Sequence, residues 1–307
     1  MGDPAGIGPE ISIKTLASPQ LNGVDMRLLG QASILRRCAD ALGLAPPGGA
    51  QLVDIPVAGM DEVQPGEISA AGGRAAEASI IKACDMAKAG DIDAIVTGPI
   101  NKESLRAAGC PHIGHTEMLA EAFGVDKPLT LFVTESLRVF FLSRHKSLRD
   151  AIDYATRGNG LDMLRRVHEA MGQLGHRNPS IAVAAMNPHS SDGGQFGTEE
   201  DEHLEPAVAD AQAEGIDARG PIGADSVFHQ GLEGVHDCVL SLYHDQGHIA
   251  TKTRDFYGTI SATLGLPVLR TSVDHGTAFD IAWQGKANEY SLVRAVEVAL
   301  ELLEAGK

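Results

Sequence analysis

The stretch Val239-Leu240-Ser241-Leu242-Tyr243-His244-Asp245-Gln246-Gly247-His248 joins a short apolar run to an abrupt polar end. A run of this kind is typical of a buried strand in a parallel sheet. Open α/β sheets bind their ligands just beyond the carboxyl ends of their strands. The histidine, carboxylate and amide that follow this run therefore lie where a functional site is expected, whereas we interpret His248 as a structural residue.

Two further histidines follow apolar runs in the same way. The run 138–143 leads to His145, and the run 181–186 leads to His189. A single histidine after a strand is more often a hydrogen-bonded structural residue, but three at equivalent positions favour a shared role. Three imidazoles with an open coordination position suit zinc, cobalt or manganese, whereas magnesium prefers oxygen ligands. We therefore interpret His145, His189 and His244 as candidate ligands of one divalent metal ion.

The composition is that of an acidic globular protein. The chain has 307 residues, a formal net charge of −16, 43% hydrophobic residues, 35 glycines and 4% aromatic residues. The length suggests one large or two medium domains, and many glycines with few aromatics suit an α/β protein better than a β-sandwich. The charge argues against nucleic acid or an anionic membrane as a partner. An anionic substrate must therefore bind in a local basic pocket.

The cysteines and the hydropathy pattern indicate a cytoplasmic protein. The four cysteines have neither CxxC spacing nor the density of a disulfide framework, which favours a reducing compartment. No apolar run approaches the ~20 residues needed to span a membrane. No signal peptide is expected. The glycine-rich opening Gly2–Glu10 would normally follow a strand and none precedes it, so we expect that the first strand is missing or that the native chain starts upstream.

Apolar runs alternate with helical patterns along the whole chain. Strands are expected at 26–30, 50–55, 94–97, 129–133, 139–142, 181–186, 235–243 and 264–269, and helices at 11–16, 34–42, 70–89, 118–123, 148–154, 160–174, 199–214 and 291–303. This alternation predicts a largely parallel sheet system with crossover helices. At this length we expect two α/β lobes with a cleft between them.

Candidate anion-binding residues also follow predicted strands. Lys102 lies in a loop that leaves a strand, where we favour a functional role over a solvated surface position. His115 and Thr116 stand near a helix start, where backbone N–H groups and a hydroxyl can face an anion. An ordinary helix cap explains Thr116 equally well but explains His115 less well. Lys252 and Arg270 suit a phosphate or carboxylate, although each alone fits an ordinary surface charge equally well.

Six motifs occur in the order found in one enzyme family, namely Gly2–Glu10, Thr97–Lys102, Gly114–Glu117, Asn187–His189, Tyr243–Gly247 and Thr263–Ala278. Over essentially the whole chain they resemble 4-hydroxythreonine-4-phosphate dehydrogenase (PdxA) and its close relatives. The resemblance implies a two-lobed α/β/α fold of the isocitrate/isopropylmalate dehydrogenase type and a homodimer with its active site at the interface. The expected lobes are 1–125 plus 270–307, with the glycine-rich and cofactor loops, and 126–269, with the metal ligands and dimer interface.

The resemblance also implies a reaction of pyridoxine biosynthesis or a close variant of it. It implies NAD- or NADP-dependent oxidation of a secondary alcohol in a phosphorylated 3-hydroxy acid, followed by decarboxylation of the β-keto acid. One divalent metal ion (Zn, Co, Mn or Mg) is implied on His145, His189 and His244. The implied substrate contacts are His115, Thr116, Lys252 and Arg270. Lys102 and Asp245 are the candidates for proton transfer.

The segment 275–288 is similar to the adenosine-binding loop of β-decarboxylating dehydrogenases. The similarity implies that the cofactor lies against His275, Gly276, Thr277, Ala278, Asp280 and Asn288, with Gly2–Gly8 nearby. Trp283 stands where a glycine is common in such loops.

Ser261 marks a departure from the pyridoxine-pathway enzymes, which carry an asparagine at this position, so a substrate contact differs. The serine resembles a paralogous branch associated with 4-phospho-D-threonate, 4-phospho-D-erythronate or aromatic cis-dihydrodiol carboxylates. The substrate therefore stays open among these and 4-phosphohydroxy-L-threonine. A phosphate acyltransferase can share this broad fold but would leave the three histidines unexplained, and a non-catalytic binding protein is a third alternative.

Overall fold

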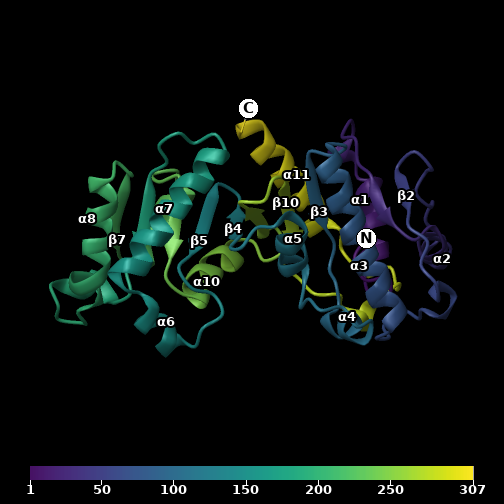
Figure 1. The fold of residues 1–307 in the computed structure, drawn as a ribbon, viewed down its shortest axis with the longest axis horizontal. Helices are drawn as coiled ribbons and strands as arrows, with labels where there is room; N and C mark the ends of the chain where they lie inside the picture. Colours follow the sequence, from purple (N-terminus) through teal and green to yellow (C-terminus); the bar gives the residue numbers. More distant parts are fainter. Residues whose placement is uncertain (307) are drawn as a thin grey trace. The chain divides into compact units, whose positions relative to one another are not determined.

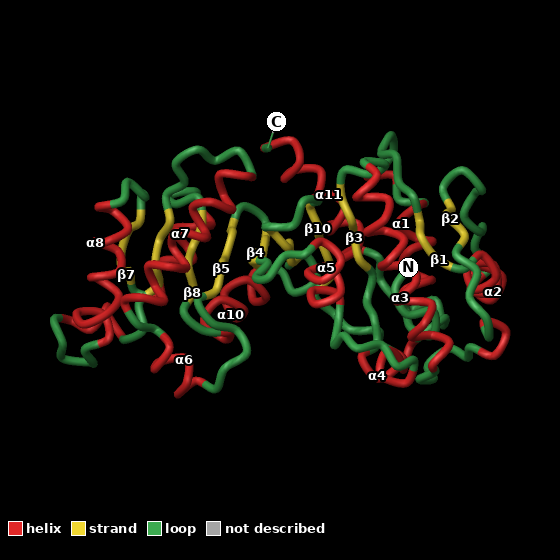
Figure 2. Tube along the Cα trace, viewed as in Figure 1, coloured by secondary structure: helices red, strands yellow, loops and turns green. Residues whose placement is uncertain are grey.

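The computed structural model describes residues 1–306 as a mixed α/β protein (Figure 1). Its contacts divide the chain into two compact units. The first comprises Met1–Pro128 and Gly265–Leu300, and the second comprises Leu129–Leu264 and the residues from Glu301 onward. Strands and helices alternate within both units, as Figure 2 shows by colour. The predicted α/β fold class is confirmed.

The first unit contains two parallel strand pairs. Strand β1 (Leu28–Gly30) pairs with β2 (Leu52–Asp54), and β3 (Ala94–Thr97) pairs with β10 (Leu269–Val273). Its helices are α1 (Gly8–Leu16), α2 (Ala32–Leu42), α3 (Ala70–Ala89), α4 (Lys102–Ala107), α5 (His115–Phe123) and most of α11 (Tyr290–Ala305).

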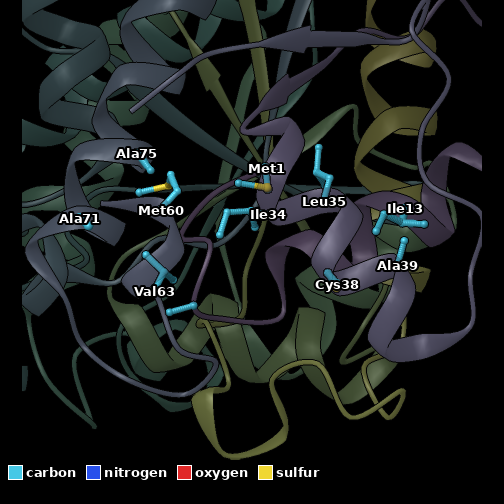
Figure 3. Packing of buried hydrophobic residues seen from close by; sticks show 11 residues of the cluster. Met1, Ile13, Ile34, Leu35, Cys38, Ala39, Met60, Val63, Ala71 and Ala75 are labelled. Atoms are coloured by element: carbon cyan, nitrogen blue, oxygen red, sulfur yellow. The ribbon is translucent and has the colours of Figure 1, made fainter. Parts of the chain in front are cut away.

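One core cluster of the first unit joins α1, α2 and α3 around the chain start (Figure 3). Four residues of α2 with helical spacing, Ile34, Leu35, Cys38 and Ala39, are completely buried in it. The remaining polar positions of α2 face outward, which is the amphipathic pattern of a surface helix.

The two faces of the β3–β10 pair differ in character. Side chains alternate between the faces of a strand, and β3 and β10 are in register with Ile95 beside Arg270 and Thr97 beside Ser272. Ile95 packs in a cluster with residues of α3 and α5, whereas Val96 packs with residues of α1 and α11. Thr97 and Arg270 therefore project from the face that α3 and α5 cover.

The second unit is built on six neighbouring strands. Their order is β9 (Ile260–Leu264), β4 (Leu129–Thr134), β5 (Leu137–Phe141), β8 (Cys238–Ser241), β6 (Ile181–Ala184) and β7 (Ala218–Ile222). The last four are parallel, as predicted, but β4 is antiparallel to both of its neighbours. The pairing of β4 with β5 follows from the two-residue turn between them, where Glu135 has a φ of 52°, because so short a connection joins only antiparallel strands.

Helices cover both faces of this second sheet. Helices α9 (Ala224–Leu232) and α10 (His244–Arg254) pack on the face that carries Val139 and Phe141. Helices α7 (Arg157–Gln173) and α8 (Glu205–Ala213) pack against the opposite face, and α6 (Leu148–Tyr154) precedes α7 along the chain. The second unit is therefore an α/β/α sandwich.

Two features differ from the sequence prediction. Within the expected strand 264–269, Leu264 ends β9, Leu269 begins β10, and residues 265–268 connect them, because Gly265 has a φ of 82° and Pro267 has no N–H for a sheet. The sequence prediction also omitted α4, β7, α9 and α10. Within residues 1–306, none of the helices combines the length and apolar character that a membrane crossing requires.

The proposed lobe boundary also differs at the carboxyl end. The prediction assigned all of 270–307 to the first lobe, whereas the last turn of α11 belongs to the second unit. Gly175 lies directly against the Ala305 carbonyl, and any side chain at this glycine would collide with it.

Candidate active site

The three predicted metal ligands follow three neighbouring parallel strands of the second unit. Strand β8 lies between β5 and β6. His145 lies in the loop after β5, His244 is the first residue of α10 just after β8, and His189 lies in the loop after β6. All three side chains are exposed. The carboxyl ends of these strands therefore present three imidazoles along one edge of the sheet.

His244 is held from two sides. Its Nδ1 lies 2.7 Å from Asp245 Oδ1, and its ring centroid lies 4.2 Å from that of His248. The His248 ring in turn stacks on Phe141, at a centroid distance of 4.8 Å. When Nδ1 donates to the carboxylate, Nε2 is the acceptor nitrogen, which is the arrangement that orients metal-binding histidines.

Gln246 holds strand ends rather than an imidazole ring. Its Oε1 accepts a hydrogen bond from the Leu242 N–H at 2.8 Å, and its Nε2 donates to the Ala185 carbonyl at 2.7 Å. The buried amide therefore connects the end of β8 to the end of β6. The sequence analysis expected this amide at a functional site, and the structure shows that it connects the strands that precede His244 and His189.

The loop that carries His189 is anchored by a buried carboxylate. Glu200 is fully buried and accepts hydrogen bonds from the backbone N–H groups of Met186 and Asn187, both at 2.7 Å. Asn187 donates from Nδ2 to Glu199 and Glu200, again at 2.7 Å, so its side chain anchors the loop. The Asn187 hydrogen bond lowers the pKa of Glu199.

The backbone after Asn187 adopts an uncommon conformation. Four consecutive non-glycine residues from His189 to Asp192 have positive φ values of 54°, 54°, 65° and 48°. Each such residue costs free energy, and the anchoring by Glu200 holds the segment in place. Strain of this kind concentrates at functional sites.

Within residues 1–306, no group of three or more His, Cys, Asp or Glu side chains is arranged to hold a metal ion. The structure thus places the three histidines at neighbouring strand ends without converging them.

The first unit contains a buried cationic group. Arg270 is 6% exposed, and its Nε and Nη2 donate to the Thr97 hydroxyl at 3.1 and 2.7 Å. His115 and Thr116 begin α5, and burial together with the positive charge of Arg270 lowers the pKa of His115 well below its usual 6.5. A neutral imidazole and a helix N-terminus therefore lie near the guanidinium, a combination suited to an anion.

The remaining predicted substrate residues lie on three different elements. Lys102 is the exposed first residue of α4, a helix whose start is capped by Asn101. In the second unit, Lys252 lies in the last turn of α10 with its Nζ 5.2 Å from the Phe256 ring centroid. Ser261 is buried in β9.

The predicted cofactor loop lies against the glycine-rich opening within the first unit. The Ile7 N–H donates to the Thr277 carbonyl at 3.0 Å. A Cβ on Gly6 would come within 2.8 Å of Thr277, so only glycine permits this approach. Ala278 has a φ of 41°, and the Asn288 side chain accepts from the Tyr290 N–H at 2.7 Å to cap α11.

Glu10 anchors the far end of this loop. It is fully buried and accepts hydrogen bonds from the Ala287 N–H at 3.0 Å, the Gly285 N–H at 3.2 Å and Lys14 Nζ at 2.8 Å. The sequence analysis included Glu10 in a motif but gave it no role. The available signal was its spacing of four residues from Lys14 on one face of a helix.

Trp283 explains a departure noted in the sequence. Its φ is 58°, in the left-handed region that favours glycine, which accounts for the glycine common at this position. The Arg37 guanidinium lies 5.5 Å from the ring centroid, and the indole packs against the cluster of Figure 3. Packing therefore holds a tryptophan in a backbone conformation that would otherwise favour glycine.

Comparisons with known proteins agree with the motif-based resemblance. The model of the family "Pyridoxal phosphate biosynthetic protein PdxA" matches residues 20–299. A Symbiobacterium thermophilum protein that bears the name "Putative D-threonate 4-phosphate dehydrogenase" is 48% identical, over 99% of this chain and 96% of its own length.

Two solved structures extend the comparison. The 4-hydroxythreonine-4-phosphate dehydrogenase of Klebsiella pneumoniae is 39% identical and superimposes with a TM-score of 0.91, covering 99% of this chain and 96% of that one. A terephthalate 1,2-cis-dihydrodiol dehydrogenase of Burkholderia xenovorans LB400 is 29% identical with a TM-score of 0.65, covering 97% and 95%. Fold and relatives together define an NAD-dependent dehydrogenase. The chain belongs to the PdxA family, as the sequence motifs predicted.

Proposed function

We propose that the protein oxidises 4-phospho-D-threonate at C3 with NAD+ and decarboxylates the resulting β-keto acid. The observation that carries this proposal is the buried Arg270 guanidinium of β10, which donates to the Thr97 hydroxyl and whose positive charge, together with burial, lowers the pKa of His115. In an acidic protein, such a site supplies the local positive charge that a phosphate needs. The name of the relative that is 48% identical supports the choice of substrate.

A second candidate substrate is 4-phosphohydroxy-L-threonine. The name of the Klebsiella pneumoniae structure favours it. The two compounds differ at C2, where a hydroxyl in the first replaces an ammonium in the second. Ser261, in place of the asparagine of the pyridoxine enzymes, supports the compound with the C2 hydroxyl. A cis-dihydrodiol carboxylate has no phosphate and would leave Arg270 without its proposed partner.

The cofactor is proposed to lie along Gly2–Gly8 and the segment 275–288. The two segments pack closely where Gly6 approaches Thr277, and Glu10 anchors the end of the second segment at Ala287. NAD+ supplies a hydride acceptor for C3. We propose contacts from His275, Gly276, Thr277, Ala278, Asp280 and Asn288.

A divalent metal ion is proposed on His145, His189 and His244. The donor chemistry fits, because Asp245 engages Nδ1 of His244 and thereby presents Nε2. When bound, zinc, cobalt, manganese or magnesium polarises the substrate hydroxyl and stabilises negative charge during decarboxylation.

We infer that a second copy of the chain completes this metal site. One chain presents the three histidines without converging them. The helix that begins at His244 carries Ile249, 64% exposed, and is followed by Phe256 and Tyr257, 60% and 58% exposed. Exposed apolar groups of this size are typical of an interaction surface. Light scattering with and without Zn²⁺ tests the inference, because a monomer that binds the metal fully would contradict it.

Lys102 is the proposed acceptor of the C3 hydroxyl proton, while Asp245 keeps His244 oriented. As the hydride leaves C3, the C3–O bond becomes the carbonyl of a ketone. The C1–C2 bond then breaks, CO2 departs, and the electron pair of the broken bond stays with C2 to form an enolate over C2 and C3, which takes a proton at C2. The product is a three-carbon hydroxyketone phosphate.

A substrate panel tests the proposal. 4-Phospho-D-threonate, 4-phospho-D-erythronate, 4-phosphohydroxy-L-threonine and a cis-dihydrodiol dicarboxylate are each incubated with NAD+ or NADP+ and a divalent metal, and NADH or NADPH absorbance is followed. We expect the highest kcat/KM with 4-phospho-D-threonate and NAD+. No activity with any phosphorylated compound would contradict the proposed function.

A further inference from the structure

An aromatic stack connects His244 to the core of the second unit. The centroid of the His244 ring lies 4.2 Å from that of His248. The His248 ring in turn stacks on Phe141, with 28° between the ring planes, and meets Phe132 edge-on at a centroid distance of 4.5 Å. Both phenylalanines are buried, in the neighbouring strands β4 and β5. His248 therefore links the exposed imidazole to two rings of the core.

The geometry of α10 brings these rings together. His244 and His248 are four residues apart, so they lie on one face of the helix. Gly247 allows this face to approach β5 closely, because a Cβ at this position would come within 2.6 Å of the Phe141 ring. The stack thus follows from the spacing of the two histidines and from the glycine beside them.

Two contacts act on the His244 ring, and they fix different properties. Asp245 Oδ1, 2.7 Å from Nδ1, determines which nitrogen carries the proton. The Asp245 side chain is 73% exposed, so water competes for this hydrogen bond. His248 is only 8% exposed and is packed against three other rings, so the ring face that it presents is held in place. We therefore expect the stacked ring, rather than the carboxylate, to limit the rotation of the His244 imidazole.

We propose that His248 is a positioning residue that holds the His244 ring in its metal-binding orientation by stacking. The proposal rests on the proposed function in one respect, namely that His244 is a metal ligand. A ligand that is already oriented loses less rotational freedom when the metal binds, which raises the affinity. Because stacking acts through the face of a ring and not through its nitrogens, another flat aromatic ring should replace His248. The sequence analysis interpreted His248 as a structural residue, and the proposal adds a role in metal binding.

The chain offers a matched set of variants. His248→Phe keeps a flat ring and removes both nitrogens, whereas His248→Leu keeps an apolar side chain and removes the ring. His236→Leu is the control, because His236 is also buried in the second unit but precedes β8, whereas His244 follows the other end of that strand. This control measures the effect of losing a buried imidazole away from His244.

Zinc affinity and the free energy of unfolding are the two measurements. The purified protein is freed of metal and titrated with Zn²⁺ in competition with a colorimetric chelator, and unfolding is followed in urea. We expect His248→Leu to weaken zinc binding by about 10–100-fold, as is typical when a residue that orients a metal ligand is lost. His248→Phe should stay within about threefold of the wild type. His236→Leu should lower the free energy of unfolding and leave the zinc affinity unchanged.

A His244→Ala arm separates the proposal from the proposed function. If His244→Ala leaves the zinc affinity unchanged, the proposed metal site is wrong and the role of His248 falls with it. If His244→Ala weakens zinc binding and His248→Leu does not, the positioning role alone is overturned.

Two further outcomes would also overturn the stacking role. Equal losses in His248→Phe and His248→Leu would show that a nitrogen of His248 is required. An equal loss in His236→Leu would show that any destabilisation of the second unit weakens zinc binding. Should His248→Leu fail to fold, His248→Met, whose flexible side chain fills irregular gaps and carries no ring, decides the question by the same criteria.

Discussion

Two regions of the molecule differ in how completely one chain assembles them. One is the buried cationic group of the first unit, and the other is the histidine edge of the second unit, which is the sheet edge that carries His145, His189 and His244. Arg270 and Thr97 are buried and bonded to each other, and His115 lies within the influence of that charge. The three histidines are exposed, and within residues 1–306 no three metal-binding side chains converge.

The difference has a physical origin. Burying a guanidinium is costly unless its donors are satisfied, so the anion-binding group must form together with the core. Exposed imidazoles carry no such penalty, so their positions need not be fixed by burial in the core. We therefore propose that the anion site is a product of folding and that the metal site is a product of assembly.

Replacing His189 with alanine should have the largest effect. If His189 is a metal ligand, we expect kcat/KM to fall by about 1,000-fold or more, equivalent to about 4 kcal/mol. Bound zinc, measured by elemental analysis of the purified protein, should fall in parallel. Thermal stabilisation by inorganic phosphate should persist, because the anion site belongs to the other unit.

The matched control is His229→Ala, which removes an exposed histidine of α9 in the same unit. It should leave activity and zinc content unchanged. Retained activity in His189→Ala, with circular dichroism like that of the wild type, would contradict the metal role. Loss of phosphate stabilisation would show that the two regions are not independent.

Much of the fold was accessible to sequence analysis because its signals are local. The predicted bounds of β3, α3 and α6 agree with the structure. Helix α3 shows why: the Ser69 hydroxyl caps its first turn and Gly90, with a φ of 74°, ends it, and both residues adjoin the helix in sequence. Helix α10 was missed because it follows the polar end of a strand and contains Gly247, a residue unfavourable in helices.

The candidate site was predictable in its residue types but not in its bonds. The histidines follow strands, so their positions at one sheet edge could be expected from chain topology. Thr97 and Arg270 are 173 positions apart, and Gln246 and Ala185 are 61 apart. Such pairs depend on which strands become neighbours, and a single sequence carries no local signal of that choice.

Replacing Gln246 with methionine should weaken the histidine edge itself. Methionine has a similar length but leaves the Leu242 N–H and the Ala185 carbonyl without their partner, and each unsatisfied buried group costs about 1–3 kcal/mol. We expect the free energy of unfolding, from urea titration, to fall by about 2–4 kcal/mol. Zinc affinity should fall as well, because the spacing between the ends of β8 and β6 is no longer fixed.

The control is Gln212→Met in the same unit, which removes one amide hydrogen bond to the Ala218 carbonyl at a more exposed position. It should cost less than about 1 kcal/mol and leave zinc affinity unchanged. Equal effects of the two variants would show that Gln246 is an ordinary structural amide.

Replacing Glu10 with alanine should loosen the proposed cofactor loop of the first unit. Two backbone N–H groups at 285–287 and the Lys14 ammonium lose their shared acceptor. We expect KM for NAD+ to rise about tenfold, equivalent to about 1.4 kcal/mol, while KM for the phosphorylated substrate stays near that of the wild type. An unchanged KM for NAD+ would show that Glu10 does not contribute to cofactor binding.

His115 should make the stability of the protein depend on pH. Burial and the Arg270 charge lower its pKa in the folded state, so the unfolded chain binds a proton more readily below pH 6.5. The resulting stability is fully present above pH 6.5 and is lost as the pH falls from 6.5 toward the lower folded-state pKa. Over that window the free energy of unfolding should decrease by up to about 1.4 kcal/mol per pH unit more in the wild type than in His115→Asn. Urea titrations between pH 7.5 and 5 would measure the two slopes, and equal slopes would mean that the imidazole is not held neutral beside Arg270.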